Sequence, residues 1–147
     1  TTALERENGI ARLALRRLVA QRIGEPIHAF PCPCCGHLVF DEPPGSYDIC
    51  GVCFWEDDAT QLKLPLYRGG ANKVSLADAQ VNFRTIGASE ARLLPHVRGA
   101  RVDEPLEPGW RPFDAAIDNP LLRIETDHEW PDDDTHLYYW RDTYWRR

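Results

Sequence analysis

The N-terminal part of the chain has the hydrophobic pattern of an amphipathic helix. Residues 10–18 repeat apolar side chains three and four positions apart, which places them on one face of a helix. Thr2 and Glu5 form a capping box at its start, and Gly24 ends it. The sequence therefore predicts a basic amphipathic helix over residues 1–25, docked on the domain with its arginines outward.

Two short runs in the middle of the chain have β-type composition. They cover residues 38–40 and 47–49, and turn-forming residues separate them. We expect the two runs to pair as a β-hairpin.

Helical patterns return after a predicted loop over residues 64–73. Ser75 is a predicted N-cap, and Gly87 ends the helix that follows it. Ser89 is expected to cap a shorter helix that runs to about Val97. The apolar face of the first of these helices holds Leu76, Ala79, Phe83 and Ile86.

The last third of the chain is more irregular in pattern. Residues 101–120 contain four prolines and predict an extended connector that wraps the surface. Residues 121–126 suit a strand. Pro131 followed by three acids marks a helix start, so residues 135–147 predict a helix with an aromatic face. A strand is the alternative there, because Tyr, Trp and Thr also suit sheets.

The five cysteines are clustered in a way that predicts a metal site. Cys32 and Cys35 form one Cys-x-x-Cys pair, Cys50 and Cys53 form another, and fourteen residues lie between the pairs. This spacing is typical of a tetrahedral thiolate site. Four cysteine ligands leave no open position, so the predicted role is structural. We choose zinc over iron, although thiolates suit both metals, and a redox dithiol is the alternative.

Cys34 is left over once the four ligands are assigned. It is either a reactive thiol beside the metal or a small packed residue, and we favour packing. His37 is a possible substitute ligand that the four cysteines make unnecessary. Phe54 and Trp55 are expected to cover the metal site, with the acids of residues 56–58 pointing outward, although the same residues also suit a binding edge.

The number of cysteines and the hydropathy of the chain together predict the cellular compartment. An odd number of cysteines cannot all pair as disulfides, and their tight spacing favours a metal site in a reducing cytosol. No run approaches the roughly 18 apolar residues that a membrane helix needs. We therefore expect a cytoplasmic protein without a membrane partner.

The charge distribution favours a basic protein partner. The chain carries a net charge of −6, with six acids and no Lys or Arg in residues 41–58. Residues 102–134 carry eleven acids against two arginines. This excess disfavours nucleic acid as a partner.

The sequence predicts no enzyme. Asp127, His128 and Glu129 have the composition of a catalytic cluster, but adjacent residues rarely converge on one point, so we expect an acidic loop there. No nucleotide-binding fingerprint or activated-nucleophile motif is present in the sequence.

Residues 31–98 resemble a known family. The stretches "PCPCCG", "YDICGVCFWEDD", "GGANKVSLADAQVNF" and "GAS" are similar to the bacterial cysteine-rich family named after its CPCC motif. The resemblance implies a small zinc-ribbon-like domain with an attached helix, no enzymatic activity, and metal ligands at the four cysteines of the two pairs. Members resemble small proteins encoded near bacterial toxin genes, which act as immunity factors.

Together these patterns predict an α+β fold with a four-cysteine, zinc-ribbon-like β-hairpin subdomain packed with several helices. We expect the N-terminal helix over 1–25, the core over 30–100, and a connector with an aromatic segment over 101–147, all in one domain. The expected function is a non-enzymatic, zinc-stabilised protein-binding module, namely an immunity protein that blocks the active cleft of a cognate toxin. The alternatives are a nucleic-acid-binding zinc ribbon and a redox protein that uses Cys34. The expected partner-binding residues are Asp127, Glu129, Trp130, Asp132, Asp133, Asp134, Trp140 and Trp145.

Overall fold

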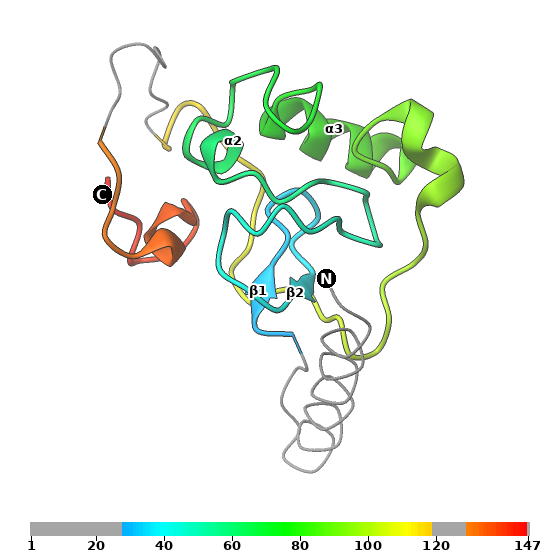
Figure 1. The fold of residues 1–147 in the computed structure, drawn as a ribbon, viewed down its shortest axis with the longest axis horizontal. Helices are drawn as coiled ribbons and strands as arrows, with labels where there is room; N and C mark the ends of the chain where they lie inside the picture. Colours follow the sequence, from blue (N-terminus) through cyan, green and yellow to red (C-terminus); the bar gives the residue numbers. More distant parts are fainter. Residues whose placement is uncertain (1–27, 119–128, 147) are drawn as a thin grey trace, which may run out of the picture.

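The computed structural model describes residues 28–118 and 129–146. Most of this chain consists of turns and irregular segments packed around two short strands, with α3 and α2 on one side (Figure 1). The predicted helix over 1–25 and strand over 121–126 lie outside the described residues. No helix within them is long and apolar enough to cross a membrane. The elements in chain order are β1 (Phe30–Pro31), β2 (Leu38–Phe40), α2 (Ala59–Lys63), α3 (Leu76–Ile86) and the 3-10 helices η1 (Ala91–His96) and η2 (Asp134–Leu137).

The two strands form an antiparallel hairpin, but not the predicted one. β2 is confirmed, and it pairs with β1, which precedes it, with Phe30 opposite Phe40. The run at 47–49 is not a strand. Instead, Ile49 forms an isolated antiparallel bridge with Glu56. The prediction was wrong because each short ladder closes around one cysteine pair, whereas we expected one ladder between the pairs.

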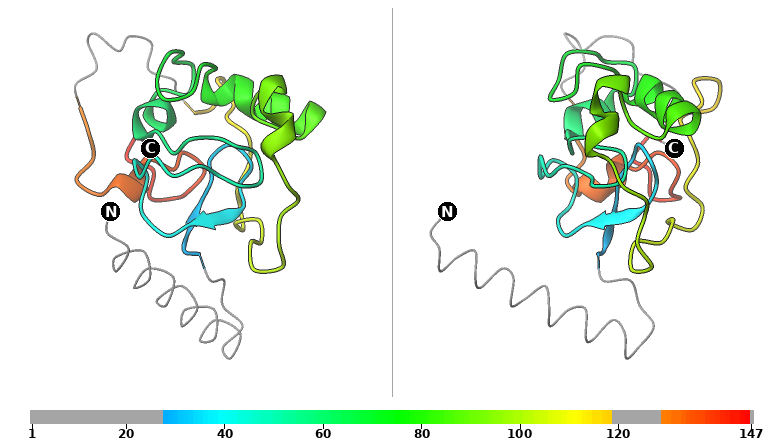
Figure 2. Two further views of the ribbon diagram at one scale, coloured as in Figure 1. Left: turned by 45° about the vertical axis from the view of Figure 1, so that its right-hand side comes forward. Right: turned by 90° about the vertical axis from the view of Figure 1, so that its right-hand side faces the viewer.

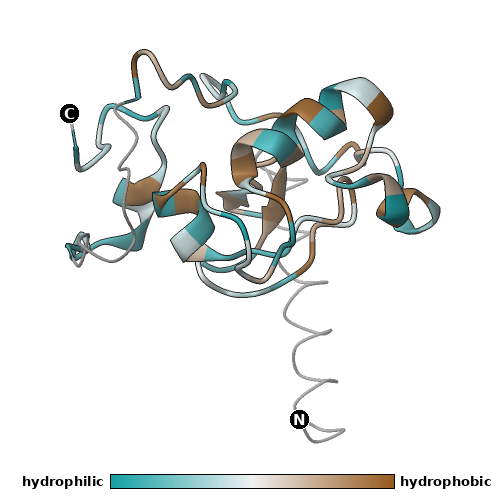
Figure 3. Ribbon diagram, turned by 90° about the horizontal axis from the view of Figure 1, so that it is seen from above, coloured by the Kyte–Doolittle hydropathy of each residue, from teal (hydrophilic) through white to brown (hydrophobic). Residues whose placement is uncertain are grey.

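α3 confirms the predicted helix and both of its caps. The Ser75 side chain accepts a hydrogen bond from the Asp78 N–H, and Gly87 ends the helix with a left-handed φ of 88°. Hydrophobic and hydrophilic positions alternate in bands along this long helix (Figure 3). Leu76 and Ala79 are buried, but Ile86 is 41% exposed. The buried face is therefore shorter than the predicted one.

The predicted second helix is a 3-10 helix, η1, and Ser89 does not cap it. Its N-cap is Glu90, which makes no side-chain capping hydrogen bond. Pro95 lies inside the helix and has no N–H to continue an α-helical ladder. Ser89 is buried, and its N–H donates to the Cys53 carbonyl over 2.8 Å. It therefore connects the end of α3 to the second cysteine pair.

The short helix α2 was not predicted, and the residue that caps it was expected to point into solvent. Asp58 is 4% exposed, and its Oδ1 accepts hydrogen bonds from the Thr60 and Gln61 N–H groups. Its Oδ2 accepts from the Ala71 N–H over 2.9 Å. A Cβ on Gly70 would lie 2.5 Å from this oxygen, so glycine is required there.

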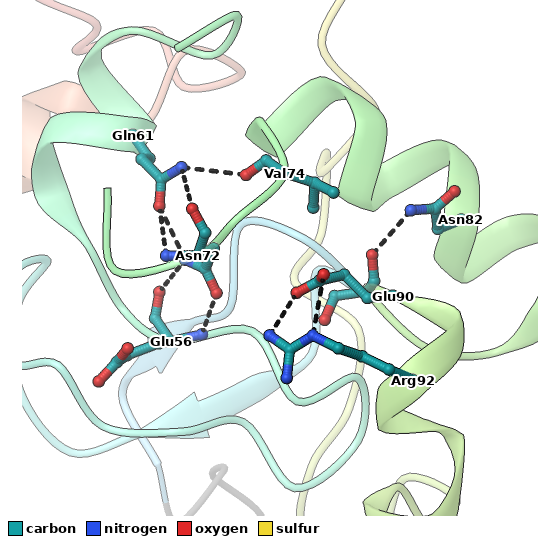
Figure 4. A network of polar contacts seen from close by, with 8 residues as sticks. Glu56, Gln61, Asn72, Val74, Asn82, Glu90 and Arg92 are labelled. Carbon is teal, nitrogen blue, oxygen red and sulfur yellow. Dashed lines mark hydrogen bonds and ion pairs between the residues drawn. The ribbon is translucent and has the colours of Figure 1, made fainter. Parts of the chain in front are cut away.

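Two buried amides organise the loop that follows α2. Gln61 Nε2 donates to the carbonyls of Tyr67, Asn72 and Val74. Asn72 Nδ2 donates to the Glu56 carbonyl and to Gln61 Oε1, and the Glu56 N–H donates back to Asn72 Oδ1 (Figure 4). The predicted loop over 64–73 is confirmed as irregular, and side chains satisfy its backbone groups.

The C-terminal segment is neither the predicted helix nor the alternative strand. Only Asp134–Leu137 forms a 3-10 helix, and turns follow it. The consecutive residues Tyr138, Tyr139 and Trp140 are all buried. A surface helix or strand turns part of any three consecutive side chains outward, so burying all three requires an irregular path.

The connector over 101–118 has no regular structure and lies mostly at the surface, as predicted, but it is also hydrogen-bonded to the first cysteine turn and to β2. The Leu38 N–H donates to the Pro105 carbonyl over 2.9 Å, and the Glu107 N–H donates to the Gly36 carbonyl over 2.8 Å. Three of its acids are buried and paired with arginines. These pairs are Glu104 with Arg98, Glu107 with Arg141, and Asp118 with Arg111.

Gln80 joins α3 to three distant parts of the chain. Its Nε2 donates to the Pro33 carbonyl and to Tyr139 Oη, each over 2.9 Å. Its Oε1 accepts from the Phe113 N–H over 2.8 Å. The side chain is 1% exposed, so no solvent replaces a lost partner.

We predict that Gln80→Leu lowers the free energy of unfolding by about 3 kcal/mol, because it leaves buried polar groups unsatisfied. Val81→Ala is the control, since Val81 is 51% exposed on the same helix. It is expected to change stability by less than about 0.5 kcal/mol. Urea unfolding of the metal-saturated protein measures both. Equal losses in the two variants would contradict the role assigned to Gln80.

Candidate metal centre

The first cysteine pair lies in a tight turn between β1 and β2. The Cys32 N–H donates to the His37 carbonyl over 2.9 Å, and the Gly36 N–H donates to the Cys32 carbonyl over 2.7 Å. Gly36 has a φ of 81°. A Cβ there would also lie 2.5 Å from the Trp110 ring. Both the backbone conformation and the close packing therefore require glycine at this position.

The second cysteine pair repeats the same backbone pattern. The Cys50 N–H donates to the Trp55 carbonyl over 2.9 Å, and the Phe54 N–H donates to the Cys50 carbonyl over 2.8 Å. Phe54 takes the position of Gly36 and has a φ of 68°. Its ring stacks on His96 at a centroid distance of 5.1 Å. Two equivalent turns therefore each present two sulfurs.

The two turns bring the four predicted thiols together. The sulfurs of Cys32, Cys35, Cys50 and Cys53 all lie within 4.8 Å of one another. The Cys32–Cys53 and Cys35–Cys50 sulfur distances are 3.6 and 3.8 Å. A tetrahedral thiolate site with metal–sulfur bonds of about 2.3 Å has sulfurs about 3.8 Å apart. These four thiols can hold a metal ion.

The buried thiols can ionise together only if a cation compensates their charge. Burial raises the pKa of Cys32, Cys35 and Cys53 above the ordinary thiol value. Burial acts on Cys50 as well, but hydrogen bonds from neighbouring thiols outweigh it and lower the pKa of Cys50. Several thiolates cannot ionise together in a buried site without a compensating cation. A bound metal ion supplies that charge.

Arg98 places a positive charge beside the second turn. Its N–H donates to the Gly51 carbonyl over 3.1 Å, and its guanidinium makes two hydrogen bonds to Glu104. A Cβ on Gly51 would lie 2.7 Å from the guanidinium. Hydrogen bonding to Glu104 raises the pKa of Arg98. No sequence motif marked this residue, because its position depends on contacts with the connector.

Cys34 and His37 lie outside the ligand set. Cys34 is 1% exposed and belongs to the hydrophobic core, as the packing interpretation predicted. His37 uses its Nδ1 in a 2.8 Å hydrogen bond with the Glu104 carbonyl. Trp55 is fully buried in the core cluster that holds the four cysteines, as expected, whereas Phe54 is only half-buried and stacks on His96.

Asp57 is buried next to the second turn, although the sequence predicted that it points outward. It is 3% exposed, and its Oδ2 accepts hydrogen bonds from the Ser46 Oγ and N–H at 2.7 and 3.3 Å. Burial raises the pKa of Asp57 from 3.8 to about 6. Both donors to this carboxylate belong to Ser46, so Asp57 connects the turn around Ser46 to the segment that follows the second cysteine turn.

The predicted partner-binding residues separate into surface and core groups. Glu129, Asp132 and Asp133 are exposed, and Trp130 is 44% exposed with its Nε1 donating to Asp134. Asp134 and Trp145 are half-buried. Trp140 is 8% exposed and hydrogen-bonds to Glu107, so it is a core residue and lies away from the predicted binding surface. Asp127 lies outside the described residues.

Comparison with known proteins agrees with this site. The family described as cysteine-rich CPCC matches residues 30–104. This range includes both cysteine turns and α3, and it ends within the connector. The chain belongs to this family. No curated protein matches it.

We predict that Cys32→Ser and Cys50→Ser each abolish tight binding of Co²⁺, whereas Cys34→Ser leaves it intact. The reason is that only the four convergent sulfurs can complete a tetrahedron. The thiolate-to-cobalt charge-transfer band, titrated under reducing conditions, measures this. Loss of the band in Cys34→Ser alone would contradict the assignment.

The carboxyl of Asp57 is expected to titrate near pH 6 in a ¹³C NMR titration. Because the folded pKa lies above the unfolded value of about 3.9, its contribution to stability is complete below about pH 4 and is lost as the pH rises to about 6. Asp133 is the internal control, since hydrogen bonds from Thr135 lower its pKa. Titration of Asp57 at or below its ordinary pH of about 4, as for Asp133, would contradict the burial of Asp57.

Proposed function

We propose that this member of the cysteine-rich CPCC family is a zinc-stabilised protein-binding module that neutralises a basic toxin by covering its active cleft. The observation that carries the proposal is the convergence of four buried thiols on one point. Such a site stabilises a fold and leaves the surface to perform the function.

Zinc is the ion that we propose for this site. Four thiolates in a tetrahedron suit zinc and iron, but zinc has no redox chemistry that would expose the buried Cys34 beside it to oxidation. The four sulfurs would hold the ion and fix the two turns relative to each other. Each ligand is at most 2% exposed, so no coordination position opens to a substrate.

The surface charge supports a basic partner. The buried acids Glu104, Glu107 and Asp118 are neutralised by arginines. The exposed acids are different, because solvent surrounds them and their potential extends outward. Glu42, Asp48, Glu129, Asp132 and Asp133 belong to this exposed group. A surface of this sign speeds association with a basic protein and repels nucleic acid.

Truncation of the connector and C-terminal segment would not isolate this surface. Trp110, Phe113 and Tyr139 from these segments pack in the core, so their removal would expose it. Surface substitutions are therefore the appropriate variants.

Removal of the metal is expected to unfold the described core. In zinc-finger peptides, binding contributes roughly 10 kcal/mol to folding, and each cysteine turn here is closed only by a very short ladder that is not stable alone. Circular dichroism after chelation, followed by addition of Zn²⁺, measures the loss and its recovery. A chelated protein with an unchanged melting temperature would contradict a structural role for the metal.

The neutralisation proposal is tested in two steps. Purified zinc-loaded protein is used to capture its partner from the native host, and the captured chain is then expressed alone. We expect a basic chain that arrests growth, and co-expression of this protein restores growth. The double variant Glu129→Gln, Asp132→Asn is expected to slow association and weaken protection. Recovery of nucleic acid or ribosomes, with no toxic chain, would contradict the proposal.

A further inference from the structure

Residues 41–49, which we call the acidic turn, present two apolar side chains to solvent. Tyr47 is 57% exposed and Ile49 is 52% exposed. They lie two positions apart on a segment that pairs with residues 55–57. The Tyr47 N–H donates to the Asp57 carbonyl over 3.0 Å, and the Asp57 N–H donates to the Asp48 carbonyl over 2.9 Å.

The acidic turn is held firmly by the core beside it. The buried Asp57 carboxylate accepts hydrogen bonds from Ser46 Oγ and N–H. Ser46 Oγ in turn accepts from the Asp48 N–H over 3.2 Å. Two exposed apolar side chains on a fixed support lose little conformational freedom when a partner covers them.

Tyr47 has a backbone conformation that a bulky residue rarely adopts. Its φ is 60°, in the left-handed region where glycine is favoured. The ring contributes little to the core, because more than half of the residue is exposed. A residue that strains the backbone and projects its ring into solvent is better explained by an external contact than by folding.

The acidic turn carries exposed charges of one sign. Glu42 and Asp48 are exposed on the same turn, and residues 41–58 contain no Lys or Arg. An aromatic residue beside an aliphatic one, rimmed by acids, has the composition of a binding hot spot for a basic chain.

The acidic turn and the C-terminal segment both lie near α2. A Cβ on Gly45 would lie 3.3 Å from the Ala59 Cβ at the start of α2. At the other end of α2, Lys63 Nζ lies 5.0 Å from the centre of the Trp130 ring. The turn and the C-terminal segment lie side by side next to α2 in Figures 1 and 2.

We propose that the acidic turn is a contact surface for an Arg- or Lys-rich segment of a protein, with Tyr47 and Ile49 at its centre and Glu42 and Asp48 at its rim. This inference rests on the proposed function in one respect only, namely that the partner is a basic protein. It does not require the partner to be a toxin.

The test uses the full zinc-loaded chain and a displayed library of random peptides. We expect selection to enrich peptides rich in Arg and Lys. These peptides should bind Tyr47→Gly roughly tenfold more weakly or worse, as expected for a hot-spot side chain. Val102→Gly, which removes an exposed apolar side chain from the connector, should bind them like the wild type.

Thermal unfolding separates a binding role of Tyr47 from a structural one. Glycine adopts a positive φ without strain, so Tyr47→Gly should melt at or above the wild-type temperature. A variant that melts well below it would show that the ring supports the fold, and the proposal would be overturned.

The outcomes also separate this proposal from the proposed function. If basic peptides bind Tyr47→Gly like the wild type but do not bind Trp130→Ala, the acidic turn is not their contact surface. That result would overturn this proposal and would still support a basic partner. Selection without enrichment of basic residues would overturn the charge argument itself. If basic peptides require Tyr47 for binding but the captured chain is not toxic, the acidic turn is supported as a contact surface. Only the proposal that the partner is a toxin would then be contradicted.

Discussion

The convergence of four cysteine sulfurs is the interaction on which the rest of the structure depends. Strands of two and three residues do not form a stable unit alone. The sulfurs fix two turns against each other, and α3, the connector and the C-terminal segment then pack on the surface that the turns create. Local sequence makes each turn, and the shared site, together with the Arg98–Glu104 contacts, fixes how the two turns face each other.

Buried amides and ion pairs take the place that sheets occupy in larger domains. Gln61, Asn72 and Gln80 are all buried, and each satisfies backbone groups from more than one segment. Irregular backbone can be buried only where such partners exist. This explains why a core with so few regular elements also contains paired carboxylates.

The features that the sequence predicted correctly are those with local causes. The spacing of the four cysteines identified the thiols that converge, and Ser75 and Gly87 identified both ends of α3. The errors have tertiary causes. Asp57 and Asp58 belong to an acidic run that suggests solvent, yet the fold buries both against polar groups from other segments. The aromatic residues 138–140 carry no periodicity that reveals their simultaneous burial, and Arg98 was missed for the same reason.

The two cysteine turns share a backbone but differ in what covers them. The Trp110 ring lies against Gly36 in the first turn, while the charged Arg98 lies against Gly51 in the second. Gly36 is buried and Gly51 is half-buried. The two sides of the centre are therefore covered unequally, and solvent reaches the backbone of the second turn at Gly51 more readily than the backbone of the first turn at Gly36.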